Sequence, residues 1–94
     1  MSENDIKTED AELLYNSIYR MVCNAIGKHA ANTILGLENE KFDPRDPMGS
    51  LERLRDKLVK GFGENTARNM FKITVRSEIN SASGDLLLEK LGIE

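Results

Sequence analysis

The chain has 94 residues, 31% of them charged, and a net charge of −3. This size predicts one domain with a single small core, and no apolar run reaches the roughly 20 residues that cross a bilayer. One cysteine, Cys23, and one histidine, His29, exclude an intrachain disulfide and a Cys/His zinc site, which needs about four ligands. With a polar N-terminus that lacks a secretory signal, these features predict a cytoplasmic protein without metal or cofactor.

The first predicted element is a long N-terminal helix. Residues 1–7 are polar and aperiodic and are expected to form a disordered tail, which leaves residues 8–94 as one helical domain. Thr8 is the expected N-cap. No proline occurs before Pro44, so the helix is predicted to run from about Glu9 to about Leu35. Gly27 is its weak point, and the sequence leaves open whether the helix continues through it.

The apolar surface of this helix spans an arc of roughly 220° at 100° per residue, about twice what one buried face requires. Within the arc, Cys23, Gly27 and Ala30 form a row of small residues where a second backbone could approach. Each large apolar side chain left uncovered forgoes about 1.5–3 kcal/mol of burial. We therefore expect a homodimer formed through this helix. The expected interface residues are Tyr15, Tyr19, Val22, Cys23, Ile26, Gly27, Ala30 and Ile34.

A proline-containing loop precedes the second predicted helix. Asp46 is the expected N-cap and Pro47 the first helical residue, because proline suits a position whose N–H is unpaired. Gly61 and Gly63 are expected to end the helix. Its apolar positions recur at helical spacing and are Met48, Leu51, Leu54, Leu58 and Phe62.

The remainder of the chain predicts two further helices. Asn65 is the expected N-cap of the third, and Ser81–Gly84 interrupts its pattern. The apolar face of that helix consists of Ala67, Phe71, Val75, Ile79 and Ala82. A short last helix from Asp85 to Leu91 supplies Leu87, Leu88 and Leu91 before Gly92. No strand alternation and no internal repeat is evident. The predicted fold is all-α, a small bundle of three main helices plus a short C-terminal helix, completed by dimerisation.

His29 and Cys23 are the two candidates for chemistry. His29 falls in the buried arc, which suits a phosphoacceptor histidine on a helical bundle, but the residues after it do not match a His-x-x-Lys-Gly motif. A packed or interface histidine is the favoured interpretation. Six positions apart on a helix, Cys23 and His29 cannot form a nucleophile–base pair within one chain. Cys23 is expected to be a buried core thiol.

Two further patterns resemble ligand sites only partly. Glu38, Glu40, Asp43 and Asp46 cluster around the proline loop but lack the order of an EF-hand, so a solvated acidic loop is favoured over a metal site. Gly61-Phe62-Gly63 precedes a helix without a preceding strand or a Gly-Lys-Ser/Thr sequence, so a helix connection is favoured over a phosphate site.

Basic residues recur at helical spacing on the second and third predicted helices, where they could face phosphates. These are Arg53, Lys57, Lys60, Arg68, Lys72 and Arg76. No aromatic residue is interleaved with the row on the third helix for base stacking. Without a catalytic constellation, the sequence favours a non-enzymatic regulatory or protein–protein interaction module that self-associates through its N-terminal helix. The alternatives are a small nucleic-acid-binding regulator and a histidine phosphotransfer domain.

Overall fold

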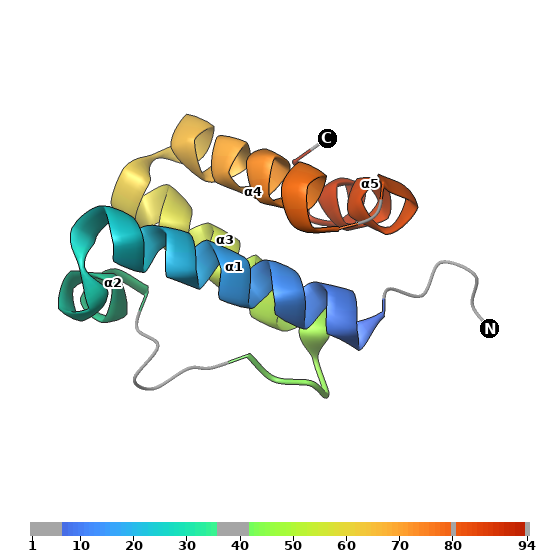
Figure 1. Ribbon diagram of the computed structural model, residues 1–94, viewed down its shortest axis with the longest axis horizontal. Helices are drawn as coiled ribbons and strands as arrows, with labels where there is room; N and C mark the ends of the chain where they lie inside the picture. The colour runs from blue at the N-terminus through green and yellow to red at the C-terminus, as the bar shows by residue number, and fades with distance from the viewer. Residues whose placement is uncertain (1–6, 36–41, 80, 94) are drawn as a thin grey trace.

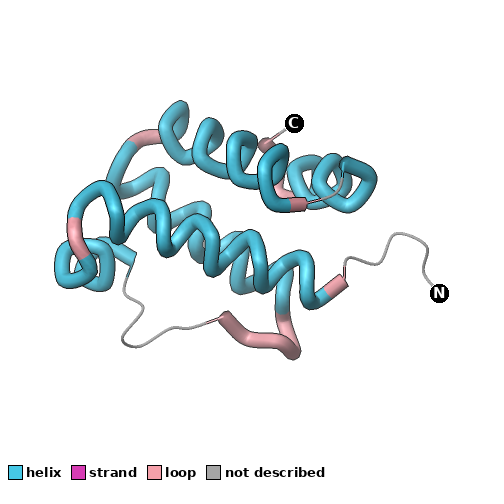
Figure 2. The backbone as a smooth tube through the Cα atoms, in the orientation of Figure 1, coloured by secondary structure: helices cyan, strands magenta, loops and turns pink. Residues whose placement is uncertain are grey.

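The computed structural model describes residues 7–35, 42–79 and 81–93, and the regular elements in this part of the chain are all helices, joined by short loops (Figures 1 and 2). The prediction of an all-α fold is confirmed. The helices are α1 (Thr8–Ile26), α2 (Lys28–Leu35), α3 (Pro47–Phe62), α4 (Glu64–Glu78) and α5 (Ser81–Lys90). Of the predicted tail, only Lys7 lies within the described residues, where it precedes α1 as its N-cap without a side-chain cap. Thr8 is thus the first helical residue and not the cap.

The predicted long N-terminal helix is two helices. Gly27 adopts φ 92° and ψ 153°, and its N–H closes α1 by donating to the carbonyl of Cys23 over 2.8 Å. α2 then folds back beside α1, so that the Tyr19 hydroxyl donates to Asn32 Oδ1 over 2.7 Å. In an unbroken helix these residues would lie about 20 Å apart along the axis. The chain therefore covers part of the α1 surface with its own next helix.

The second half of the bundle begins as predicted. Asp46 is the N-cap of α3, with its side chain accepting a hydrogen bond from the Gly49 N–H, and Pro47 opens the helix. Gly61 lies inside α3, whereas Gly63, at φ 93° and ψ 159°, is the turn to α4. α4 starts directly after this glycine, so the predicted cap at Asn65 is wrong.

Gly27 and Gly63 lie 36 positions apart, and the same spacing relates the buried residues of α1–α2 to those of α3–α4. The equivalent buried pairs are Leu14 and Ser50, Tyr15 and Leu51, Ile18 and Leu54, Val22 and Leu58, Ala31 and Ala67, and Leu35 and Phe71. The packing follows the same rule, because α1 contacts α4 as α3 contacts α2. We call α1–α2 the first hairpin and α3–α4 the second hairpin. The bundle is thus an internal repeat, which the sequence conceals because most equivalent positions carry different residues.

α5 has no counterpart among the described residues of the first hairpin. It begins at Ser81 instead of Asp85, and Ala82 is exposed on it instead of extending the apolar face of α4. α5 packs against α4, with Gly84 placed directly against Val75 (Figure 1). Leu87, Leu88 and Leu91 are buried as predicted. We expected three main helices and a short last helix around one small core. The structure instead forms the core from two hairpins of helices, with α5 packed against α4.

Candidate interaction surface

The structure divides the eight predicted interface residues into two groups. Tyr15 and Val22 are 6% and 1% exposed, so they belong to the core of the single chain and are not available to a partner. The Tyr15 ring also meets Phe42 edge to face, with ring centroids 5.5 Å apart. These two predictions are wrong because α2, α3 and α4 already cover this side of α1.

Tyr19, Cys23 and Ile26 lie on a neighbouring side of α1 and remain accessible. Ile26 is 37% exposed, and the other two are half-buried. A hydrogen bond to Cys23 is the main reason that the pKa of the Tyr19 phenol is raised, and burial adds to it. This side of α1 therefore combines an exposed isoleucine with a polar cluster that is closed by Asn32.

The predicted row of small residues does not form one ridge. The turn at Gly27 redirects the chain, so Ala30 follows α2 and no longer continues the line of Cys23. Ile34, on the same side of α2 as Ala30, lies against Gly61 of α3 and is still 36% exposed. The row is thus distributed over two helices, and Gly27 lies exposed at the corner between them.

The segment after α5 packs against the outer side of the second hairpin. Leu91, Gly92 and Ile93 lie against it, beside a pocket of about 270 Å³ that Arg55, Val59 and Glu64 also line. Arg55 Nη1 donates to the Leu91 carbonyl over 2.6 Å, and Arg68 Nη2 donates to the Ile93 carbonyl over 3.1 Å. Two arginines thus fasten the segment that follows α5.

The residues of the second hairpin that surround Leu91–Ile93 have equivalents 36 positions earlier, on the first hairpin. We define the outer face of the first hairpin by the equivalent residues, Tyr19, Cys23, Lys28, Ala31 and Asn32. The places of Arg55 and Arg68 are taken by Tyr19 and Asn32, which bond to each other. In the described part of the chain, neither of them holds a backbone carbonyl of a third segment. The second hairpin therefore holds the segment Leu91–Ile93 on its outer side. On the equivalent side of the first hairpin, Ile26 is exposed.

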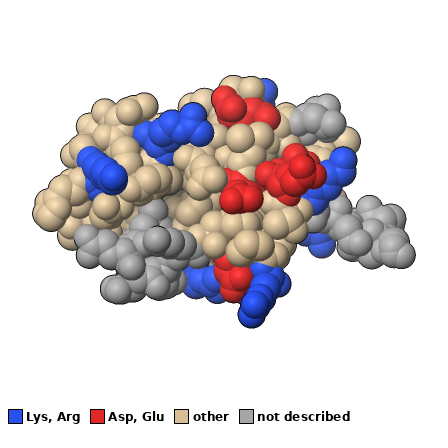
Figure 3. All heavy atoms as spheres, turned by 60° about the horizontal axis from the view of Figure 1, so that its bottom comes forward, with Lys and Arg blue, Asp and Glu red and all other residues tan. Residues whose placement is uncertain are grey.

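The predicted basic rows are broken by contacts within the chain. Arg53 pairs with Asp46 at 3.7 Å, and Arg68 pairs with Glu64 at 3.5 Å besides holding Ile93. Lys57 and Lys72 are half-buried, whereas Lys60 and Arg76 are exposed. On the face shown in Figure 3, acidic side chains gather near the middle and basic side chains lie in separate places around them, so no continuous basic area appears. Arg55, which fastens the C-terminal segment, was not among the predicted site residues, because nothing in its spacing distinguishes it from a solvated arginine.

His29 and the acidic loop also differ from expectation. His29 is exposed on α2, so the interpretation of a packed histidine is wrong, and the reason is again the change of direction at Gly27. Asp43 and Asp46 accept backbone N–H groups of Arg45 and Gly49. Glu38 and Glu40 lie outside the described residues. The described part of the chain contains no group of three or more potential metal ligands and no helix long and apolar enough to span a membrane.

Comparison of the chain with protein-family models, with curated proteins and with solved structures finds no match.

Proposed function

We propose that this protein is a non-enzymatic protein–protein interaction module, and that two copies associate through the outer faces of their first hairpins. The observation that carries the proposal is the equivalence of the two outer sides. The second hairpin covers its outer side with Leu91–Ile93, whereas at the equivalent face of the first hairpin the described residues leave Ile26 exposed. In the proposed dimer, a second copy covers this face.

The energetics favour a contact of this kind. A chain of this length buries only about 60–65% of the surface of its unfolded form, so additional burial is worth proportionally more than in a larger domain. Ile26 and the apolar parts of Tyr19 and Cys23 form the centre of the contact. Asn32 and Lys28 form a polar rim, as in most specific interfaces. In a two-fold arrangement, the outer face of the first hairpin lies on both sides of the contact, and the assembly closes at a dimer.

Sedimentation equilibrium from low to high micromolar concentration tests the proposal. We expect a monomer–dimer equilibrium for the natural sequence. Ile26→Glu places a charge in the centre of the contact and should weaken dimerisation by about tenfold or more, which corresponds to roughly 1.4 kcal/mol. Ile73→Glu is the matched control, because Ile73 is 59% exposed and lies on α4, whereas the proposed contact is formed by α1 and α2.

Three results would contradict the proposal. The natural sequence could remain a monomer at high micromolar concentration, Ile26→Glu could leave the equilibrium unchanged, or Ile73→Glu could disrupt it equally. Circular dichroism of each variant separates loss of association from loss of folding. Binding to random duplex DNA that weakens steeply with salt would instead favour the nucleic-acid alternative.

A further inference from the structure

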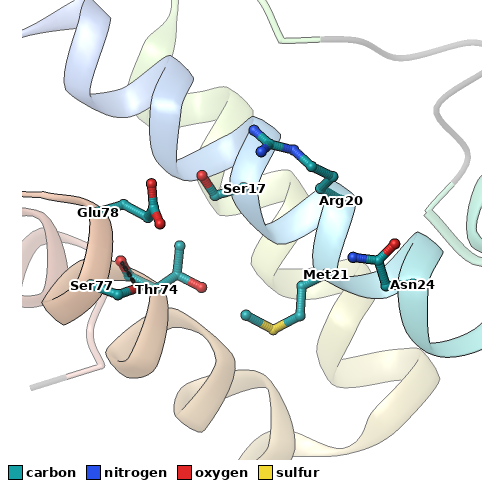
Figure 4. A pocket seen from close by; sticks show the side chains of 7 residues that line it. All are labelled: Ser17, Arg20, Met21, Asn24, Thr74, Ser77 and Glu78. Carbon is teal, nitrogen blue, oxygen red and sulfur yellow. Dashed lines mark hydrogen bonds between the residues drawn. The ribbon is translucent and has the colours of Figure 1, made fainter.

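A second feature lies on the opposite side of α1, where this helix meets α4. The two helices enclose a groove of about 250 Å³ at the junction of the two hairpins (Figure 4). α1 contributes Ser17, Arg20, Met21 and Asn24, and α4 contributes Thr74, Ser77 and Glu78. Polar side chains thus converge on this groove from both hairpins.

Two hydroxyls in the floor of the groove have no hydrogen-bond partner. Ser17 Oγ and Thr74 Oγ1 are shielded from solvent, and Thr74 as a whole is 1% exposed. A serine or threonine in a helix commonly donates to a carbonyl of the preceding turn, as Ser77 does to Ile73 over 3.0 Å. Burial of an unpaired hydroxyl costs roughly 1–3 kcal/mol. Figure 4 shows the Thr74 hydroxyl directed from α4 toward α1.

Opposite charges stand at the mouth of the groove. Arg20 comes from α1 and Glu78 from α4, and neither has an ion-pair partner within the described ranges. In Figure 4 their charged groups lie on either side of the Ser17 hydroxyl. The guanidinium provides a planar set of donors that suits a carboxylate, and the carboxylate of Glu78 suits an ammonium group. An anion would be repelled by Glu78 and a cation by Arg20, so the pair selects a ligand that carries both charges.

We propose that this groove binds a free α-amino acid. Its carboxylate meets the Arg20 guanidinium and its ammonium group donates to the Glu78 carboxylate. The side chain of Met21, which is half-buried and unbranched, turns aside to admit the ligand to the two hydroxyls. Those hydroxyls then gain the partners that they lack in the free protein.

The size and the place of the groove agree with a ligand of this class. A groove of about 250 Å³ lies below the range of about 300–1,000 Å³ that is typical of sites for drug-sized ligands, which suits a ligand as small as an amino acid. The groove lies between two packed units, where ligand sites are frequent. A ligand there contacts both hairpins and therefore stabilises the bundle.

Backbone NMR titration of the full chain with each of the twenty amino acids up to 10 mM tests the proposal. We expect saturable shifts of α1 and α4 amides around Ser17 and Thr74 with a subset of the amino acids. The N-acetyl and carboxamide derivatives of the best ligand each remove one charge and should bind about tenfold more weakly or worse, as expected for loss of a charged hydrogen bond. Arg20→Gln and Glu78→Gln should weaken binding to the same degree.

Matched controls come from exposed charges elsewhere. Arg45→Gln in the loop and Glu52→Gln on α3 should bind the ligand as the natural sequence does. Thr74→Val keeps the shape of the side chain and should weaken binding while leaving the fold at least as stable, which distinguishes a ligand contact from a structural role. Absence of binding by all twenty amino acids, equal binding of the blocked derivatives, or equal binding by Arg20→Gln would overturn the proposal.

Discussion

The two helical hairpins share one frame but differ on their outer sides. Both turn at a glycine with φ near 92°, and both bury residues at equivalent positions. In the first, Tyr19 and Asn32 bond to each other, whereas in the second Arg55 and Arg68 reach out to the carbonyls of Leu91 and Ile93.

The two hairpins thus differ in the residues at two equivalent positions, and these residues make different hydrogen bonds. A tyrosine hydroxyl can donate and an asparagine amide oxygen can accept, so these two side chains can bond to each other. An arginine carries five donors and no acceptor. Arg55 and Arg68 therefore bond to acids of their own hairpin, Asp56 and Glu64, and still have donors for the carbonyls of Leu91 and Ile93. The second hairpin thereby holds Leu91–Ile93, whereas within the described residues Tyr19 and Asn32 hold no backbone carbonyl of a third segment.

Leu35 and Phe71 are fully buried at equivalent positions of the two hairpins. Leu35→Ala and Phe71→Ala should therefore both lower the free energy of unfolding by a large amount. We expect Leu35→Ala to lower the free energy of unfolding by about 2–5 kcal/mol and Phe71→Ala by about 3–5 kcal/mol. Urea denaturation measures both against a total of about 5–15 kcal/mol. A cost below 1 kcal/mol for Leu35→Ala would show that α2 is not packed as its counterpart is.

The outer-side contacts should differ in strength. Arg55→Met keeps the aliphatic stem but removes the bond to Leu91 and the exposed ion pair with Asp56. We expect a cost of about 1.5–2 kcal/mol, mostly from the bond to Leu91, because its donor is charged. Tyr19→Phe removes a neutral bond and should cost about 1 kcal/mol or less. Chemical denaturation monitored by circular dichroism compares them. A larger effect for Tyr19→Phe would reverse our ranking of the two sides.

The two turns predict equal costs for Gly27→Ala and Gly63→Ala. A Cβ at either position meets no atom within 4 Å, so the penalty comes only from the backbone, which lies in a region reserved almost entirely for glycine. We expect a loss of roughly 1–3 kcal/mol for each. Thermal unfolding should give the same shift for both variants, and a clearly smaller shift for Gly27→Ala would indicate that α1 and α2 can join into one helix.

Helix capping differs between equivalent positions. Asp46 caps α3, whereas Asp10, its counterpart 36 positions earlier, lies within the first turn of α1. Asp46→Ala should cost about 1 kcal/mol, and Asp10→Ala should change stability by less than about 0.5 kcal/mol. Equal losses in urea denaturation would contradict the assigned start of α1.

The smallest effect concerns alkaline pH. Contact with Cys23 and burial raise the pKa of Tyr19 above its ordinary value of 10.0. The folded chain therefore keeps this proton at a pH where the unfolded chain has lost it. The resulting stabilisation is complete below pH 10 and is lost as the pH rises through the raised value. The stability difference between the natural sequence and Tyr19→Phe should thus shrink above pH 10, and a difference that is constant from pH 8 to 11 would argue against the cluster.

Much of the second hairpin follows from local sequence. Asp46 and Pro47 define the start of α3, and Leu51, Leu54 and Leu58 recur at helical spacing on a face opposed by charges. These signals act within one or two turns of helix, so they need no information about neighbours. The first hairpin was less predictable, because a glycine within an apolar helix is compatible with both a continuous and a broken helix.

The sequence by itself determined that the chain is helical, where α3 begins, and that Leu87, Leu88 and Leu91 are buried, because periodicity and capping are local properties. Only the tertiary structure decided that Gly27 breaks the first helix, that Tyr15 and Val22 serve the chain's own core, and that His29 is exposed. It also revealed the repeat, since burial at equivalent positions depends on which helices meet and not on residue identity. The α1–α4 groove and the contact between Tyr19 and Asn32 arise in the same way, from residues that the fold brings together across helices.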